Sequence, residues 1–149
     1  MTDLPEQGQS LPDVDFITED GSAFSSSEFA GQKTVLYFYP KDDTPGCTKE
    51  ACAFRDRIGD YEAAGIRVYG VSLDSPESHR RFREKHNLNF PLLTDGNGKA
   101  SGLLGVLSEK GRARRVTFLL FENGTVAKSY PQVSPETHAD EILSDAASL

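Results

Sequence analysis

Two apolar runs enclose a stretch with helical periodicity, and this order constrains the fold of the chain more than any other feature. Residues 33–39 (KTVLYFY) and 66–73 (IRVYGVSL) are rich in β-branched and aromatic side chains, as buried strands are. Between them, apolar residues from Ala51 to Tyr61 recur at three- and four-residue steps, which is typical of an amphipathic helix. A strand, a helix and a strand of these lengths form a crossover unit, which predicts two parallel strands in an α/β fold.

The remaining pattern adds two helices and three short strands to this unit. Helices are expected at 75–87 and 134–149, and strands at 90–95, 115–121 and 125–131. Ser75 and Ser134 each precede a proline and are suitable helix caps, and Asn123-Gly124 between two apolar runs is typical of a hairpin turn. We therefore expect one α/β domain over residues 1–149, with a mixed central β-sheet flanked by helices.

Size and charge narrow the classes of protein to which the chain can belong. Its 149 residues suffice for one ordinary domain, and no apolar run approaches the roughly 18 residues of a membrane span. Residues 1–16 lack a basic flank and an apolar segment, so no secretory signal is expected and the cytoplasm is the expected location. The net charge of −7, with dispersed basic residues, disfavours nucleic-acid binding.

The two cysteines of the chain lie close together, just after the first strand. Thr44 is a suitable cap and Pro45 a suitable first residue of the helix, so Cys47 falls in its first turn. Free backbone N–H groups and the positive end of the helix stabilise an anion there, and a thiolate is such an anion. The alternative is that both cysteines are small packing residues.

Cys52 follows Cys47 by five residues. On a helix this spacing places it ~7.5 Å along the axis and roughly 140° around it. A disulfide needs Cα atoms within about 7 Å and converging Cβ vectors, so the two thiols cannot bond while the helix is intact. A bond between them requires at least one turn to unwind. The alternative is that Cys52 packs in the core beside Ala51 and Phe54.

A zinc site is disfavoured by the number and spacing of the available ligands. Structural zinc needs four ligands, often as close pairs, whereas His79, His86 and His138 are scattered over two other predicted helices. We therefore expect no metal and no cofactor. A nucleophilic Cys–His pair assembled by folding remains an alternative, although no local signature supports it.

Pro40, Thr44 and Cys47 form the pattern Pro-x-x-x-Thr-x-x-Cys, which resembles the active-site motif of the peroxiredoxins. The longer string YPKDDTPGCTKEACAFRD at 39–56 resembles their Q-type branch, the bacterioferritin-comigratory proteins, where a second cysteine lies five residues after the first. RVTF at 115–118 is similar to another motif of the family, and the order of elements matches over nearly the whole chain. The resemblance implies a thioredoxin-like fold and a thiol-dependent peroxidase of hydrogen peroxide and organic hydroperoxides.

The resemblance also implies roles for individual residues. Cys47 would be the peroxidatic cysteine, whose thiolate attacks the hydroperoxide and becomes a sulfenic acid. Thr44 would bond the thiolate and the incoming oxygen, and Pro40 would shield the sulfenic acid from water. Arg115 would hold the thiolate and polarise the peroxide, because negative charge shifts to the leaving oxygen.

Five further residues complete this expected site or lie beside it. Backbone N–H groups of Gly46 and Cys47 would add donors for the substrate, and Glu50 would orient the arginine. Cys52 would be the resolving cysteine, which closes an intramolecular disulfide that thioredoxin or a similar dithiol then reduces. Arg112 and Arg114 are expected to be solvated loop charges.

An intramolecular cysteine pair removes the need for a partner subunit, so a monomer is expected. Two other functions stay open at this point. A disulfide oxidoreductase of the thioredoxin type would share the architecture, but the chain has no Cys-x-x-Cys. A redox sensor would present a new surface when it is oxidised.

Overall fold

A mixed seven-stranded sheet forms the centre of the computed structural model, which describes residues 4–149. The strands are β1 (Asp15–Ile17), β2 (Ala23–Ser25), β3 (Lys33–Phe38), β4 (Ile66–Ser72), β5 (Leu92–Thr94), β6 (Val116–Leu120) and β7 (Val126–Tyr130). Their order across the sheet is β2-β1-β5-β4-β3-β6-β7, so the first long strand of the chain, β3, lies inside the sheet.

The predicted crossover unit is confirmed. β3 and β4 pair in parallel, from Lys33 opposite Ile66 to Phe38 opposite Val71, and β4 and β5 also pair in parallel. The other neighbours are antiparallel. The predicted hairpin joins β6 to β7, and Gly124 at its tip has the left-handed φ of +83° that the turn requires.

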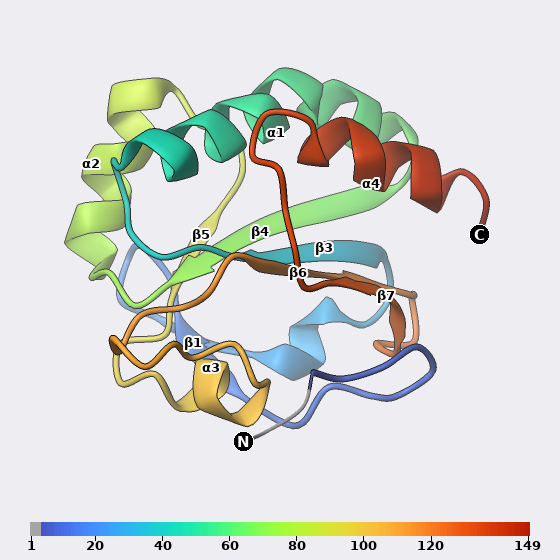
Figure 1. Cartoon of the computed structure of the whole chain (residues 1–149), viewed down its shortest axis with the longest axis horizontal. Coiled ribbons are helices and arrows are strands. Elements are labelled where there is room, and N and C mark those ends of the chain that lie inside the picture. The colour runs from blue at the N-terminus through green and yellow to red at the C-terminus, as the bar shows by residue number, and fades with distance from the viewer. Residues whose placement is uncertain (1–3) are drawn as a thin grey trace.

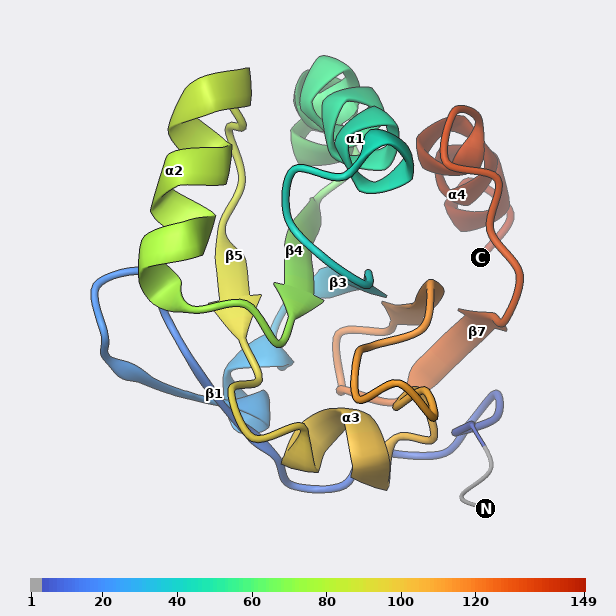
Figure 2. The ribbon, with the colours of Figure 1, turned by 60° about the vertical axis from the view of Figure 1, so that its left-hand side comes forward.

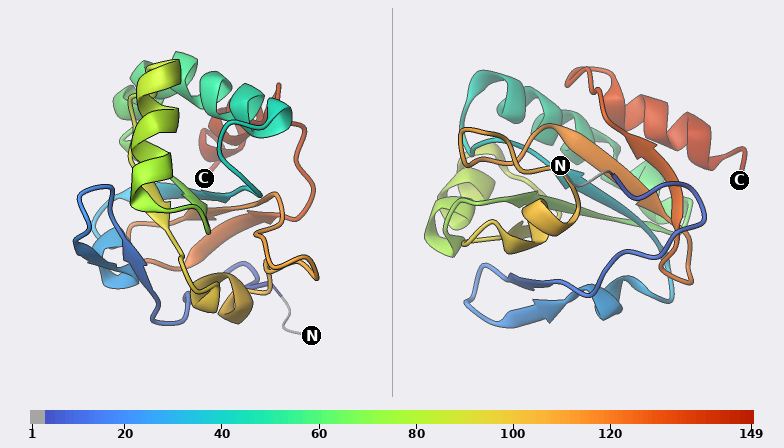
Figure 3. Two further views of the ribbon diagram at one scale, coloured as in Figure 1. Left: turned by 90° about the vertical axis from the view of Figure 1, so that its left-hand side faces the viewer. Right: turned by 60° about the horizontal axis from the view of Figure 1, so that its bottom comes forward.

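Helices cover both faces of this sheet. They are α1 (Pro45–Ala63), α2 (Pro76–His86), α3 (Lys99–Leu103), α4 (His138–Ala146) and a 3₁₀ turn, η1 (Ser26–Phe29). α1, α2 and α4 lie on one face, and α3 and η1 on the other, as Figure 1 shows. Figure 2 shows α1 between α2 and α4, and Figure 3 shows the same layers from two further directions.

Alternating side chains of β3 fill the two cores on either side of the sheet. Val35 and Tyr37 belong to the core under α1, α2 and α4, whereas Leu36 and Phe38 belong to the core on the opposite face. Because both faces are covered, the strand is apolar throughout rather than alternating. The ring of Tyr37 stacks on Phe54 of α1 with centroids 4.6 Å apart, which fixes α1 against the sheet.

The last helix begins later than its sequence predicts. Ser134 was expected to cap it, but its carbonyl accepts hydrogen bonds from the backbone N–H groups of Thr137 and His138 in a preceding turn. α4 starts at His138, and Thr137 rather than Ser134 is its N-cap residue. The short elements β1, β2, η1 and α3 were not predicted at all, because three to five residues show no measurable periodicity.

Candidate active site

Cys47 lies in the first turn of α1, as predicted. The helix begins at Pro45, and Thr44 precedes it in an extended conformation at the N-cap position. The Cys47 side chain belongs to the core under α1, and the residue is only 2 % exposed. The sulfur is therefore largely shielded from water while it lies at the positive end of a 19-residue helix.

Thr44 occupies the predicted cap position but does not cap the helix with its side chain. Its hydroxyl donates instead to the carbonyl of Lys41, at 2.8 Å. The predicted capping bond is therefore wrong, because the hydroxyl is held toward the loop by its bond to Lys41 and accepts from no backbone N–H of the first turn. The bond to Lys41 keeps this hydroxyl on the loop, beside the start of α1.

Arg115 contacts both Cys47 and Glu50. It lies directly before β6, and its Nη2 donates to Cys47 Sγ at 3.4 Å while its Nη1 donates to Glu50 Oε1 at 2.8 Å. Gly46 lies against the same guanidinium, since a Cβ atom at that position would come within 3.0 Å of Nη2. Arg112 and Arg114 are exposed, which agrees with the solvated loop positions expected for them.

Glu50 belongs to α1 and is fully buried, and only one of its carboxylate oxygens is satisfied. Oε1 accepts from Arg115, whereas Oε2 has no hydrogen-bond partner among the residues that the structure describes. Burial raises the pKa of Glu50 from 4.5 to about 7, although the charge of Arg115 acts in the opposite direction. Burial lowers the pKa of Arg115, but Glu50 and Cys47 outweigh it and hold this pKa above its ordinary value.

Cys52 is half-buried on the same unbroken helix, and both cysteines are free thiols. It lies between Ala51 and Phe54, which are fully buried, so its side chain is only partly in the core. With α1 continuous from residue 45 to residue 63, the two sulfurs are held apart by the geometry of the helix. Pro40 is half-buried at the end of β3, where the loop to α1 begins.

The predicted residues thus form a compact centre with three neighbours. Arg115 contacts Cys47, Glu50 and the space at Gly46, while Thr44, Pro40 and Cys52 flank this centre without a hydrogen bond to it. The histidines do not gather around the sulfur, and residues 4–149 contain no group of three His, Cys, Asp or Glu side chains that could hold a metal ion. In the same range, no helix is long and apolar enough to cross a membrane.

One buried polar cluster escaped the sequence reasoning. Asp42, in the loop before α1, pairs with His79 of α2 at 2.8 Å. The two residues are 37 positions apart, and nothing in the local sequence of either one indicates the other. Only the packing of α2 against the loop brings them together.

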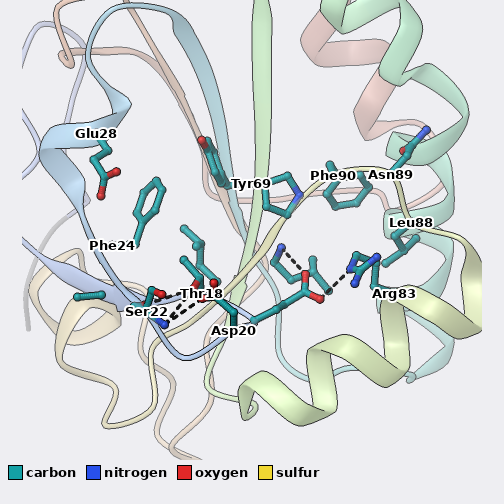
Figure 4. Close-up of a pocket in the computed structure, with 15 residues that line it drawn as sticks. Thr18, Asp20, Ser22, Phe24, Glu28, Tyr69, Arg83, Leu88, Asn89 and Phe90 are labelled. Carbon is teal, nitrogen blue, oxygen red and sulfur yellow. Dashed lines mark hydrogen bonds and ion pairs between the residues drawn. The ribbon is translucent and has the colours of Figure 1, made fainter.

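A separate pocket of about 690 Å³ lies away from the sulfur (Figure 4). Its walls come from 18–28, Tyr69 and 83–93, and none of the predicted site residues lines it. Arg83 binds Glu19 within it at 2.7 Å, so its basic side chain is already paired. The candidate site at Cys47 is therefore distinguished by its thiol, cation and helix terminus rather than by a large cavity.

Known proteins match this chain over nearly its whole length. The model of the AhpC/TSA family matches residues 7–129. A putative peroxiredoxin bcp of Coxiella burnetii is 41% identical over 145 residues, which cover 93% of this chain and 96% of that protein. A chloroplastic peroxiredoxin Q of Populus jackii is 42% identical over 146 residues, covering 96% of this chain and 68% of the relative.

A solved structure shows the same likeness in three dimensions. It is a structure of the Xanthomonas campestris bacterioferritin comigratory protein, described in terms of its alkyl peroxide reduction activity, and it is 31% identical with a TM-score of 0.86. The match covers 97% of this chain and 96% of that one. The chain therefore belongs to the AhpC/TSA family and is a thiol-dependent peroxidase of the peroxiredoxin Q, or bacterioferritin-comigratory, branch, with a thioredoxin-like fold.

Proposed function

We propose that Cys47 is the peroxidatic cysteine of this peroxidase. The observation that carries the proposal is the contact of 3.4 Å between Arg115 Nη2 and Cys47 Sγ, in the first turn of α1. The guanidinium and the helix terminus both stabilise a thiolate, which is the reactive form of the thiol. The thiolate attacks the terminal oxygen of a hydroperoxide, the O–O bond breaks, and the leaving oxygen takes a proton to become an alcohol or water.

The neighbouring groups support this step in different ways. Arg115 stabilises the negative charge that moves from sulfur to the leaving oxygen, and Glu50 holds the guanidinium in place through its 2.8 Å bond. The backbone N–H groups of Gly46 and Cys47, in the first turn of the helix, supply further donors. Thr44 assists once its hydroxyl turns from Lys41 toward the substrate, and Pro40 shields the oxidised sulfur from water.

Cys52 is the proposed resolving cysteine. Its sulfur attacks the sulfenic sulfur of Cys47, an S–S bond forms, and the hydroxyl leaves as water. Because the two residues lie on one intact helix, the first turns of α1 must open before the bond can form. A dithiol then reduces the disulfide by exchange, and we propose thioredoxin as that dithiol.

The substrates, the cellular location and the oligomeric state complete the proposal. We propose alkyl hydroperoxides and hydrogen peroxide as substrates, because the Xanthomonas relative is described as reducing alkyl peroxides. We propose the cytoplasm as its location, because a chain with only two cysteines has no framework of structural disulfides. An intramolecular disulfide lets the chain act as a monomer, which size-exclusion chromatography would test.

Peroxide-dependent consumption of reduced thioredoxin tests the proposed function. Cys47→Ser should abolish turnover, because serine provides no thiolate. Cys52→Ser should still convert one equivalent of peroxide but should lose turnover with thioredoxin, because no disulfide forms. Sustained turnover by Cys47→Ser would refute the role of Cys47, and undiminished turnover of Cys52→Ser with thioredoxin would refute that of Cys52.

A further inference from the structure

The loop that leads into the reactive helix is held from the side by α2. This loop, Pro40–Thr44, runs beside α2 in Figure 1, where it joins β3 to α1. Its two consecutive aspartates, Asp42 and Asp43, both point to α2 and bind four of its side chains. We name these four residues the α2 clamp: Ser78, His79, Lys85 and His86.

The buried half of the clamp binds Asp42. Oδ2 of Asp42 accepts from Ser78 Oγ at 2.8 Å and from His79 Nδ1 at 2.8 Å, and Oδ1 accepts from the hydroxyl of Tyr39 at 2.5 Å. His79 is completely buried, and Asp42 is 6 % exposed. A buried carboxylate with this many donors is held in a single geometry, because losing any one donor leaves an unpaired polar atom.

His79 is itself fixed at both ring nitrogens. Nε2 faces the carbonyl of Leu93 in β5 at 3.0 Å, while Nδ1 faces Asp42, with the Tyr39 hydroxyl also 3.4 Å from it. One ring nitrogen thus faces an oxygen of the sheet and the other an oxygen of the loop. The ring therefore ties the loop to the central sheet as well as to α2.

The exposed half of the clamp holds a strained residue. Asp43 has a left-handed φ of +59°, which aspartate tolerates better than most side chains but still at some cost. Lys85 Nζ and His86 Nε2 bind its carboxylate at 2.8 and 3.2 Å. These hydrogen bonds hold the pKa of Asp43 below its ordinary value, so the carboxylate stays charged for its partners.

The position of the clamp matters because α1 must open and close in every catalytic cycle. Opening starts at Pro45, directly after the clamped loop, and frees Cys47 from its place beside Arg115. The loop before it is bound to α2, and Asp42 N–H also donates to Asp74 Oδ2 at 2.8 Å. The loop before Pro45 is thus held in place, and the first turn of α1 can refold from it.

We propose that the α2 clamp is a positioning device for the peroxidase: by fixing Pro40–Thr44, it confines the unwinding to residues after Thr44 and returns Cys47 to Arg115. The inference rests on the proposed roles of Cys47 and Cys52. Its residues do not touch the reacting atoms, and they act through the geometry of the loop. A weaker clamp has opposite consequences for the two chemical steps.

The first step, reaction of Cys47 with peroxide, needs the closed geometry of α1. The second step, closure of the disulfide, needs the first turn of α1 to be open. Reaction of Cys47 with peroxide depends on its alignment with Arg115, so a loose loop slows this step. Closure of the disulfide depends on how often the first turn is unwound, so a loose loop speeds that step or leaves it unchanged. A change that merely lowers the stability of the whole fold has no reason to separate the two rates in this way.

Asp42→Asn tests the proposal by removing the charge of the buried carboxylate, and Ser78→Ala is a milder variant that removes one hydroxyl donor. Rapid-quench intact-mass analysis after peroxide addition follows both steps, since the sulfenic acid gains one oxygen and the disulfide loses two hydrogens relative to the dithiol. The rate of sulfenic acid formation should fall roughly ten- to a hundredfold in Asp42→Asn and less in Ser78→Ala. The rate of disulfide closure should rise or stay unchanged in both.

Arg81→Ala is the matched control, because Arg81 lies on α2 but, within residues 4–149, pairs only with the exposed Glu77 of the same helix. It should leave both rates unchanged. Any other pattern in the clamp variants, whether both rates fall together or neither changes, overturns the proposal. If the wild-type chain forms neither the sulfenic acid nor the disulfide after peroxide addition, the proposed function fails instead, so the two failures are distinguishable.

Discussion

The site depends on a few atoms around one guanidinium. Arg115 donates to the sulfur of Cys47 and to the carboxylate of Glu50, and Gly46 leaves the space that this side chain needs. Lysine could not make the same pair of contacts, because its ammonium group lacks the planar fork of arginine. The chemistry is therefore set by the identity of single side chains as much as by the fold.

Gly46→Ala tests how closely the guanidinium is positioned. The new methyl group would lie 3.0 Å from Arg115 Nη2, so the guanidinium has to move by a few tenths of an ångström. We expect reaction with peroxide to slow by roughly tenfold while the folded state is not destabilised, because alanine favours a helix over glycine. The second-order rate of peroxide reduction and the free energy of unfolding measure the two effects.

Gly59→Ala provides the control on the same helix. A methyl group there meets nothing within 4 Å, so the change should stabilise the folded chain by about 0.5–1 kcal/mol and leave the rate of peroxide reduction unchanged. Equal rates for the Gly46→Ala variant and the wild type would show that the contact with Arg115 does not limit the reaction.

At the scale of elements, the site is the junction of α1 with the strand β6. The crossover of β3, α1 and β4 was predictable because its apolar patterns are long and strongly periodic. The start of α1 was predictable from Pro45. The hydrogen bond of the Thr44 hydroxyl was not predictable, because its acceptor, the carbonyl of Lys41, depends on how the loop folds. The start of α4 was missed for the same reason, since a turn at Ser134 precedes the helix.

Glu50 makes this junction sensitive to pH. Burial raises the pKa of Glu50 from 4.5 to about 7, so as pH rises the unfolded chain loses this proton before the folded chain does. The wild type should therefore lose stability between about pH 4.5 and about pH 7, on the order of 3 kcal/mol, relative to Glu50→Gln. Denaturant unfolding of both proteins across this range measures the difference.

Glu136→Gln is the control for that comparison, because the Glu136 side chain is 70% exposed and, in the described part of the chain, pairs only with the exposed Lys49. Its stability should follow that of the wild type at every pH. If the free energies of unfolding of the wild type and Glu50→Gln also change in parallel with pH, the buried carboxylate does not titrate in this range and its raised pKa is wrong.

At the scale of the whole molecule, helices cover both faces of the sheet, and the candidate site lies at the start of one of them, α1. The continuous apolar character of β3 indicated burial on both sides, and the structure places one core on each face of the sheet. The sequence motifs identified Cys47, Glu50 and Arg115 by resemblance, and the structure brings them into contact. The pairing of Asp42 with His79 needed coordinates, because it joins elements that no periodicity relates.

The mass of the reduced chain after one equivalent of hydroperoxide tests the central claim most directly. The account predicts that the wild type loses two hydrogens as Cys47 and Cys52 join, that Cys52→Ser gains one oxygen instead, and that Cys47→Ser keeps its mass. A Cys47→Ser chain that consumes the peroxide at the wild-type rate, or a wild type that stays a dithiol, would contradict it.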